Sequence, residues 1–310
     1  MTGRVRGAIT AAVVAAAALT APSAAVAAPA QDCAPWQVRT VATGLGLPLE
    51  NLAFDGRGGL LVSRTLFAGN GTIERVTPDG AVSTLLPVRG PGALTVRGDE
   101  LYINTGHLTV DGTLGLKTGT IDIYDFGTGN RRTWATDLTM PDGGTVLPNG
   151  DAVISTLIGP KRGIWLVRKD NPSAPERYGP DLLGPNGMVI GNDGRTLYVA
   201  NTGGPDFQIA GIDLANPSAP AKKIRLQAPW PLNIIDDLTI GPDGRLYTAG
   251  EHGIVYRVDP ESGSTCAIAT GVHLGSSVRF GAGPGWDPES LYSTGFDGAV
   301  RRLVPPGEGE

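Results

Sequence analysis

Four oxygen-bearing side chains occupy the same place in four copies of one repeated sequence pattern. The pattern is a polar or small residue followed by a short apolar strand, and it begins at positions 50, 92, 142, 186, 236 and 276. Four of these positions hold an acid or an amide, namely Glu50, Asp142, Asn186 and Asp236. Carboxylate and amide oxygens are the ligands that hard divalent cations prefer. If these positions meet, they predict one cation site. The expected ion is Ca²⁺, and another divalent cation is the alternative. Asp237 is either a fifth ligand or a neighbour that points outward along its strand.

The spacing of the repeat indicates how these residues meet. Successive copies are 42, 50, 44, 50 and 40 residues apart. In a strand-rich sequence, a period of this size is typical of propeller blades, which repeat around an axis. Equivalent positions of the blades therefore converge on that axis. The sequence predicts an all-β fold, a six-bladed β-propeller.

Turn signals and the two ends of the repeat array support this fold. Asp-Gly or Asn-Gly pairs follow the first strand of four copies, at 55–56, 149–150, 193–194 and 243–244, as hairpins require. The last copy has no fourth strand after its third, and the strand at 38–42 has no blade in front of it. We expect the N-terminal strand to close the last blade, because closure removes the exposed edges of an open array.

The first residues have the composition of a targeting segment. Arg4 and Arg6 precede an alanine-rich apolar run, and a small-residue cleavage signal follows at 25–27. This pattern predicts a secretory signal peptide over 1–28 and a secreted, monomeric propeller over 29–310, with no membrane span. The whole chain has a net charge of −5, and loss of the two arginines makes it −7 (−5 − 2). An acidic protein of this kind is not expected to bind nucleic acid or an anionic membrane.

The chain has two cysteines, Cys33 and Cys266. Cys33 precedes the strand at 38–42, and Cys266 begins a similar strand, with Ala-Thr-Gly in both segments. Export permits a disulfide between them, which would tie the N-terminus to the fifth blade. The alternative is a pair of unbonded, buried thiols.

One face of the predicted propeller carries the irregular connections, and all three histidines fall on it. His107 lies three residues beyond Asn104, where it could shuttle a proton, hydrogen-bond a substrate oxygen, or be an ordinary surface residue. The simplest interpretation of His252 and His273 is that they are ordinary surface residues. Aromatic residues of the same loops are expected to line a substrate pocket together with His252; these are Phe67, Phe207 and Phe296.

Two segments of the chain carry a resemblance to a known family. Residues 185–202 and 236–247 resemble the fourth and fifth blades of the regucalcin/gluconolactonase family of six-bladed propellers, to which paraoxonases and bacterial drug-responsive lactonases are related. In that family a divalent cation on the axis is held by a Glu, an Asn and an Asp, which correspond to Glu50, Asn186 and Asp236. Asp142 matches the third-blade residue of the drug-responsive lactonases.

The sequence also departs from these relatives. Gluconolactonases have an arginine for sugar-lactone recognition just ahead of the third-blade residue, and the stretch 138–141 has none. Sugar lactones are therefore not the expected substrates. Paraoxonases place a histidine after an asparagine at the end of the second strand of blade two, and His107 is displaced from that place by two residues.

Three functions follow from these observations. The first is a secreted Ca²⁺-dependent hydrolase of lactones or related esters, in which Asp236 or Asp142 takes a proton from water while Glu50 and Asn186 hold the cation. The second is a non-catalytic secreted propeller with a structural metal that binds a protein or a cell-wall ligand. The third is a condensing enzyme similar to strictosidine synthase, which would use a pocket glutamate such as Glu251 and no metal.

Overall fold

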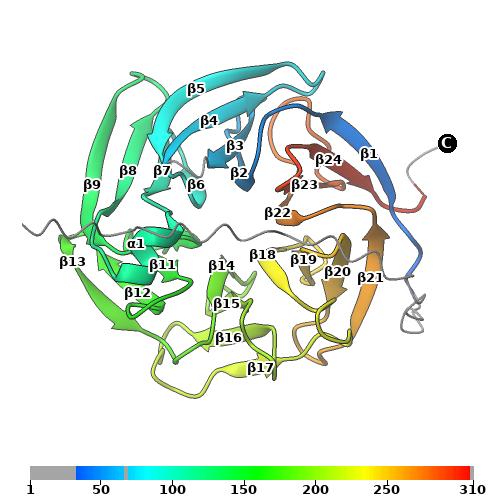
Figure 1. Ribbon diagram of the computed structural model, residues 1–310. Helices are drawn as coiled ribbons and strands as arrows, with labels where there is room; N and C mark the ends of the chain where they lie inside the picture. Colours follow the sequence, from blue (N-terminus) through cyan, green and yellow to red (C-terminus); the bar gives the residue numbers. More distant parts are fainter. Residues whose placement is uncertain (1–32, 66–68, 308–310) are drawn as a thin grey trace, which may run out of the picture. The chain divides into compact units, whose positions relative to one another are not determined.

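The computed structural model describes residues 33–65 and 69–307. The fold below is that of the compact unit Gln31–Glu310. The predicted signal peptide, 1–28, lies outside the described residues. Six four-stranded antiparallel sheets stand in a ring around one axis (Figure 1). The predicted six-bladed β-propeller is confirmed.

The strands of each blade follow one another from the axis outward. Blade one contains β2 (Leu49–Phe54), β3 (Leu60–Thr65), β4 (Asn70–Val76) and β5 (Val82–Arg89). Blade two contains β6 (Leu94–Arg97), β7 (Glu100–Thr105), β8 (Gly119–Asp125) and β9 (Arg131–Leu138). Blade three contains β10 (Gly144–Val146), β11 (Ala152–Thr156), β12 (Gly163–Arg168) and β13 (Asn171–Tyr178).

The second half of the ring repeats this order. Blade four contains β14 (Pro185–Ile190), β15 (Thr196–Asn201), β16 (Ile209–Asp213) and β17 (Lys222–Ile224). Blade five contains β18 (Ile235–Ile240), β19 (Leu246–Gly250), β20 (Ile254–Val258) and β21 (Thr265–Thr270). Blade six contains β22 (Gly275–Phe280), β23 (Leu291–Gly295) and β24 (Val300–Val304), and its outer strand is β1 (Gln37–Ala42).

The N-terminal strand closes the ring as predicted. β1 pairs antiparallel with β24, from Gln37 opposite Val304 to Ala42 opposite Val300. The last blade is therefore built from both ends of the propeller. Because every blade has a neighbour on each side, the ring has no open end.

Burial decreases from the axis outward. All six residues of β2 are buried, whereas exposed and buried residues mix along β5. An inner strand is covered on both faces by the adjacent blades, so its polar residues, such as Glu50 and Asn51 of β2, are buried together with its apolar ones. Between blades six and one, Phe54 packs edge-on against Trp286 and Tyr292. Any polar residue at the start of an inner strand is thus carried into a buried place.

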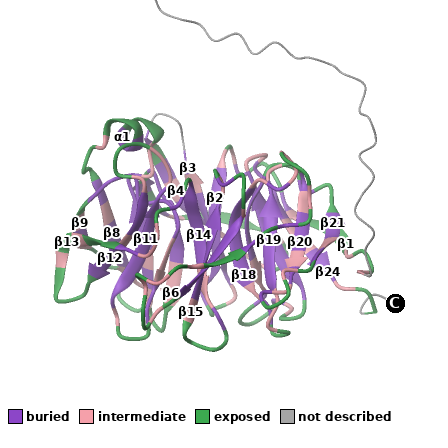
Figure 2. Cartoon of the chain, turned by 90° about the horizontal axis from the view of Figure 1, so that it is seen from below, coloured by how far each residue is buried: buried purple, intermediate pink, exposed green. Residues whose placement is uncertain are grey.

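One short helix, α1 (Thr109–Leu114), is present among the described residues, in the connection from β7 to β8. Figure 2 shows α1 standing above the strands on the face where the inner strands begin. In the part of the chain that the structure describes, no helix is both long and apolar enough for a membrane span.

The predicted disulfide is confirmed. Cys33 is bonded to Cys266 of β21, and their Cα atoms are 6.1 Å apart. The segment between Cys33 and β1 also lies on blade five, because the Trp36 amide donates to the Ile268 carbonyl at 2.7 Å. The disulfide thus fastens the segment before β1, the outer strand of blade six, to β21, the outer strand of blade five.

We expect removal of this bond to weaken the closed ring. Because the bond encloses 233 positions of chain, replacing both cysteines with serine should lower the free energy of unfolding by about 2–5 kcal/mol and the melting temperature by roughly 5–15 °C. Scanning calorimetry measures the change. A reducing agent should produce the same drop in the wild type and none in the variant. Equal melting temperatures for all samples would contradict a stabilising role.

Candidate metal centre

The inner strands deliver their polar residues to the axis through irregularities in strand pairing. The register of β2 with β3 shifts between Leu49 and Leu52, that of β14 with β15 between Pro185 and Met188, and that of β18 with β19 between Ile235 and Leu238. A bulge of this kind turns one side chain away from its regular direction. The shifted stretches contain the predicted ligands Glu50, Asn186 and Asp236, which are all buried.

The structure brings two of the predicted ligands, Glu50 and Asp142, together with His107 in one close group. Ligand atoms of Glu50, His107 and Asp142 all lie within 4.8 Å of one another. His107 Nε2 is 3.4 Å from Asp142 Oδ1, and the His107 side chain is only 12% exposed. Of the three interpretations that the sequence allowed for His107, the structure excludes an ordinary surface position.

His107 reaches the axis because blade two has no side chain of its own there. The equivalent position in blade two is Gly92, where an added Cβ would be 2.8 Å from the Asp142 carbonyl oxygen and 3.4 Å from His107 Cβ. The connection from β7 folds back over this space, held by the His107 amide, which donates to the Gly90 carbonyl at 2.8 Å. An imidazole from a loop thus takes the place that an inner-strand side chain occupies in other blades.

Asp236 belongs to the same electrostatic environment but not to this close group. Burial raises its pKa well above the usual range for aspartate, and the charges of Glu50 and Asp142 raise it further. Glu251, which follows β19, acts on Asp236 in the same direction. The sequence assigned Glu251 only to the condensing-enzyme alternative, yet its charge bears on the centre.

The pKa values of the close group are shifted because several acids are buried together. Burial is the main cause of the raised pKa of Glu50, about 7, which His107 lowers and Asp142 raises. Burial also raises the pKa of Asp142, against the effect of His107. Burial lowers the pKa of His107, but the charges of Asp142 and Glu50 outweigh it and leave this pKa raised. The carboxylates outnumber the one imidazole, so the group is short of positive charge.

Two polar atoms of this group lack a protein partner. Asp142 Oδ2 and His107 Nδ1 are buried and make no hydrogen bond to the described residues. An unpaired buried polar atom costs about 1–3 kcal/mol, so it usually marks a place for water, an ion or a ligand. The backbone around Asp142 is held firmly by Asn104 Nδ2, which donates to the carbonyls of Asp142 and Gly143 at 3.1 Å. A free carboxylate oxygen on a fixed backbone is a suitable ligand for a cation.

Asp237 has a different role from its neighbour Asp236. Its Oδ2 accepts hydrogen bonds from Asn51 Nδ2 at 2.9 Å and Ser277 Oγ at 2.6 Å, and it pairs with Arg279 at 2.8 Å. The Asp237 carboxylate is therefore neutralised in a second layer of axis residues. Of the two interpretations that the sequence allowed, this geometry favours a neighbour over a fifth ligand.

The predicted pocket residues lie in different surroundings. Phe67 lies outside the described residues. Phe207 is half-buried on the core between blades three and four, with Lys223 Nζ 5.1 Å from its ring centroid. His252 is exposed and Phe296 is half-buried. Their role in a substrate pocket stays a prediction.

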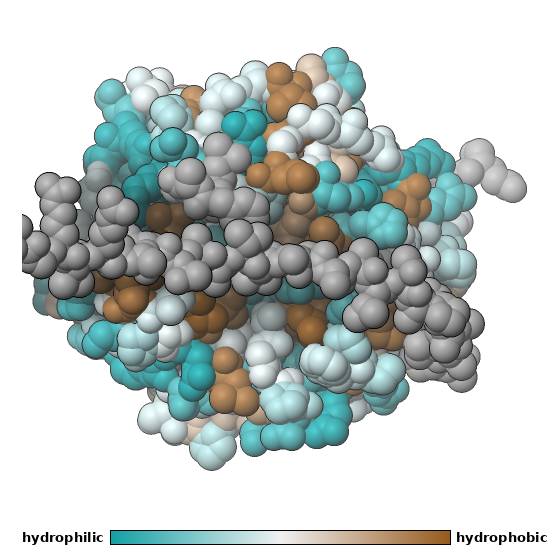
Figure 3. Space-filling model, viewed as in Figure 1, coloured by the Kyte–Doolittle hydropathy of each residue, from teal (hydrophilic) through white to brown (hydrophobic). Residues whose placement is uncertain are grey.

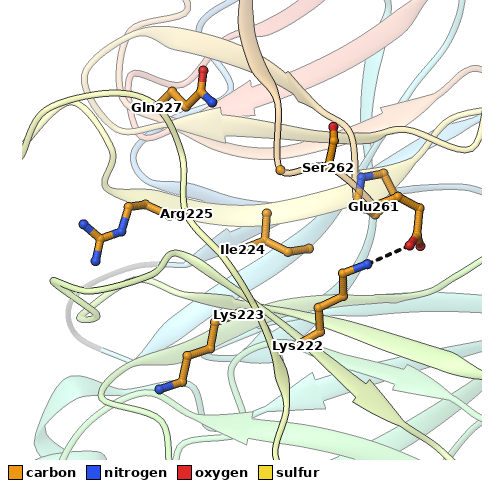
Figure 4. Close-up of a pocket in the computed structure, with 9 residues that line it drawn as sticks. Lys222, Lys223, Ile224, Arg225, Gln227, Glu261 and Ser262 are labelled. Carbon is orange, nitrogen blue, oxygen red and sulfur yellow. Dashed lines mark hydrogen bonds and ion pairs between the residues drawn. The ribbon is translucent and has the colours of Figure 1, made fainter.

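A separate hollow of about 280 Å³ lies away from the axis. It is formed at β17 and the turn before β21, and Lys222 Nζ pairs there with Glu261 at 2.8 Å (Figure 4). Its other lining residues include Lys223 and Arg225. This basic hollow shares no residue with the acidic centre.

Comparison with solved structures identifies the same kind of fold. A gluconolactonase from Xanthomonas campestris aligns with 87% of this chain and 90% of its own, at 17% identity and a TM-score of 0.66. Another protein described as a gluconolactonase aligns with 89% and 94%, at 18% identity and a TM-score of 0.67. A calcium-binding regucalcin from Agrobacterium tumefaciens aligns with 88% and 95%, at 18% identity and a TM-score of 0.65. No protein-family model and no curated protein matches the sequence. The resemblance predicted from the sequence is confirmed at the level of the fold.

The raised pKa of Glu50 predicts how the stability of the metal-free protein depends on pH. The folded protein holds this proton more tightly, with a pKa of about 7 against 4.5 for an ordinary glutamate. Protonated Glu50 therefore contributes its full share to the free energy of unfolding below pH 4.5. This contribution, about 3 kcal/mol, is lost as the pH rises to about 7. Denaturant unfolding in chelator from pH 4.5 to 8 measures it.

The matched variant is Glu50→Gln, which has no proton to lose. Its stability should fall less steeply over this pH range, although Asp142 and Asp236 keep part of the slope because their pKa values are raised too. Identical slopes in wild type and variant would show that Glu50 is not held in this environment.

Proposed function

We propose that the protein is a secreted metal-dependent hydrolase of lactones or related esters. The observation that carries this proposal is the buried group of Glu50, His107 and Asp142, in which one carboxylate oxygen has no partner. A group with excess negative charge and a histidine offers both a place for a cation and a carrier for a proton. The fold shared with gluconolactonases and regucalcin supports the same assignment.

The residues at the starts of the inner strands would hold the cation. Glu50, Asp142 and Asp236 offer carboxylate oxygens, and Asn186 offers an amide oxygen. This all-oxygen set suits Ca²⁺, with Mg²⁺ or Mn²⁺ as alternatives. When bound, a divalent cation balances the carboxylates and polarises a substrate carbonyl. We assign the imidazole of His107 to proton transfer, because hard cations prefer oxygen to nitrogen ligands.

His107, oriented by Asp142, would move the proton of the reaction. In ester hydrolysis, water attacks the carbonyl carbon, the bond from that carbon to the alkoxide oxygen breaks, and one water proton ends on the alkoxide. His107 accepts this proton at a ring nitrogen and returns it to the leaving oxygen. Asp142 orients the ring through its contact with Nε2 and stabilises the imidazolium that forms. Burial raises the pKa of Asp236, the other base expected from the sequence, well above its usual range, and the charges of Glu50 and Asp142 raise it further.

The approach to the centre does not favour a sugar lactone. No arginine precedes Asp142, where Leu138, Thr139 and Met140 are buried. Met140 instead fills the space beneath α1, because an added Cβ at Gly112 would overlap its sulfur. We therefore assign the substrate to lactones or esters with few hydroxyl groups.

The two alternatives make different demands on the centre. A non-catalytic propeller with a structural metal needs the carboxylates but gives no function to a buried histidine beside them. A metal-free condensing enzyme would depend on Glu251, which is half-buried and has a pKa raised mainly by burial. It leaves the oxygen atoms on the axis unexplained.

Metal binding should require the axis carboxylates. We expect Ca²⁺ to raise the melting temperature of the wild type, and Asp142→Asn and Asp236→Asn each to weaken binding by about 100-fold, because each removes a charged ligand. Calorimetric titration of the chelator-treated protein measures binding. Asp206→Asn is the matched control, since Asp206 is exposed on a loop of the same face. Equal binding by all the variants would refute the site.

Hydrolysis should depend on the same metal. A panel of lactones and aryl esters, assayed with and without chelator, should show turnover that chelation abolishes and Ca²⁺ restores. Asp236→Ala should abolish this turnover and leave the fold intact. Turnover that survives both changes would end the proposal, and a calcium-dependent melting shift without any turnover would favour the non-catalytic alternative.

His107 can be tested as a proton carrier rather than a ligand. His107→Gln should lower kcat by about 100-fold or more, which is the usual contribution of a general acid–base. The calcium-dependent melting shift should remain, because the variant keeps all four oxygen ligands. If His107→Gln loses this shift as Asp142→Asn does, then His107 is a metal ligand and its assigned role is wrong.

A further inference from the structure

Exposed apolar side chains collect on the face that carries the metal centre. The described residues include nine large apolar side chains that are exposed, and seven of them lie in connections on this face. We call these seven the rim; they are Leu47, Val110, Leu114, Leu116, Leu183, Trp230 and Leu274. The other two, Val38 on β1 and Val82 on β5, lie on outer strands. Figure 3 looks onto this face and shows apolar side chains at separate places around the axis.

The rim is distributed around the axis on this face because it shares loops with the axis residues. It occupies five connections, and in four of them an exposed apolar residue comes shortly before the first residue of an inner-strand repeat. The offsets are three residues from Leu47 to Glu50, three from Leu183 to Asn186, six from Trp230 to Asp236 and two from Leu274 to Ser276. In the fifth connection, α1 begins two residues after His107.

The helix in this rim has its apolar side turned to solvent. Asp111 is buried and pairs with Arg89 at 2.8 Å, and it also accepts a hydrogen bond from Thr118. Val110 and Leu114, one turn apart, are 57% and 63% exposed. An ordinary surface helix buries its apolar stripe and exposes its charges. The arrangement in α1 is the opposite, with the acid buried and the two large apolar side chains exposed.

Two further rim residues are hard to explain as ordinary surface positions. Trp230 is 73% exposed, although tryptophan is rarely left in water and is typical of the boundary between water and lipid. Leu274 has a φ of 50° and is 47% exposed. A left-handed conformation is unfavourable for leucine, and such conformations cluster at functional places.

We propose that the rim docks this face of the propeller on a neutral, zwitterionic lipid surface, with its side chains inserted just below the headgroups. The side chains stand singly on five connections around a ring, so only a broad and deformable apolar partner contacts all of them together. Side chains on loop tips can enter lipid while their backbone stays in water, which avoids the cost of burying peptide groups.

Charge and shape favour lipid of this kind over other partners. The net charge of −5 disfavours an anionic membrane. A peptide helix or strand would need a continuous groove. The hollow at β17 and a second hollow of about 300 Å³ beside Trp165 are lined by other residues than the rim. Docking of this kind turns the face that carries the metal centre toward the lipid. The docking proposal does not depend on whether the protein is a hydrolase.

The test compares two double variants on phosphatidylcholine vesicles. Leu114→Ser/Trp230→Ser removes two rim side chains, and Val38→Ser/Val82→Ser removes two exposed apolar side chains elsewhere. Both keep the N-terminal segment, so a difference between them reports on the rim. In vesicle sedimentation, the wild type and the control should bind equally, whereas the rim variant should bind at least roughly tenfold more weakly.

A second measurement places Trp230 in the bilayer. Bromine quenches tryptophan at short range, so vesicles of brominated phosphatidylcholine should quench the wild type and quench Trp230→Phe much less. Absence of binding, or equal loss in both double variants, would overturn the proposal. So would a dimer seen by light scattering that only the rim variant loses, since the rim would then be an interface between two copies of the chain.

Discussion

The shortage of positive charge on the axis is the constraint on which the rest of the site depends. Two unit charges of one sign about 4–5 Å apart repel by about 3–4 kcal/mol at an effective dielectric constant of ~20. The second layer solves this problem with protein groups alone, since Asp237 has Arg279 as its counter-ion. The first layer has only His107 for several acids, and a bound cation would complete its balance. The second layer is thus neutralised by an arginine of the protein, whereas the first layer has no arginine or lysine among the described residues for its carboxylates.

A closed ring is what allows such a layer to persist. Glu50 and Asp236 are 186 positions apart in sequence (236 − 50), and like charges in a flexible assembly would move apart or become protonated. Here β1 closes the last blade and the disulfide ties it to β21, so no inner strand can withdraw from the axis alone. Close contacts add to this, because Gly187 leaves room for the carboxylate of Asp237 that a Cβ would fill. The stability of the ring therefore holds the carboxylates together.

The sequence was informative where the structure repeats and silent where it does not. The regular spacing of Glu50, Asp142, Asn186 and Asp236 predicted the blades, and the strand before Glu50 predicted the closure, because strand periodicity is a local property that recurs. The place of His107 could not be read in this way. It depends on the missing side chain at Gly92 and on the path of a loop, and loops carry no period. The effect of Glu251 on Asp236 depends likewise on a connection, the one after β19.

The metal centre and the rim impose consistent conditions on the same face. Removing water from the mouth of a charged site strengthens every electrostatic interaction inside it, including the polarisation of a substrate carbonyl. A rim seated on lipid would exclude water from above the centre without a lid, which fits the short helix α1 and the short connections around it. It would also admit substrates from lipid rather than from water. Sugar lactones are poorly soluble in lipid, and the absence of an arginine before Asp142 is then expected, because an apolar substrate offers no hydroxyl groups for an arginine to recognise.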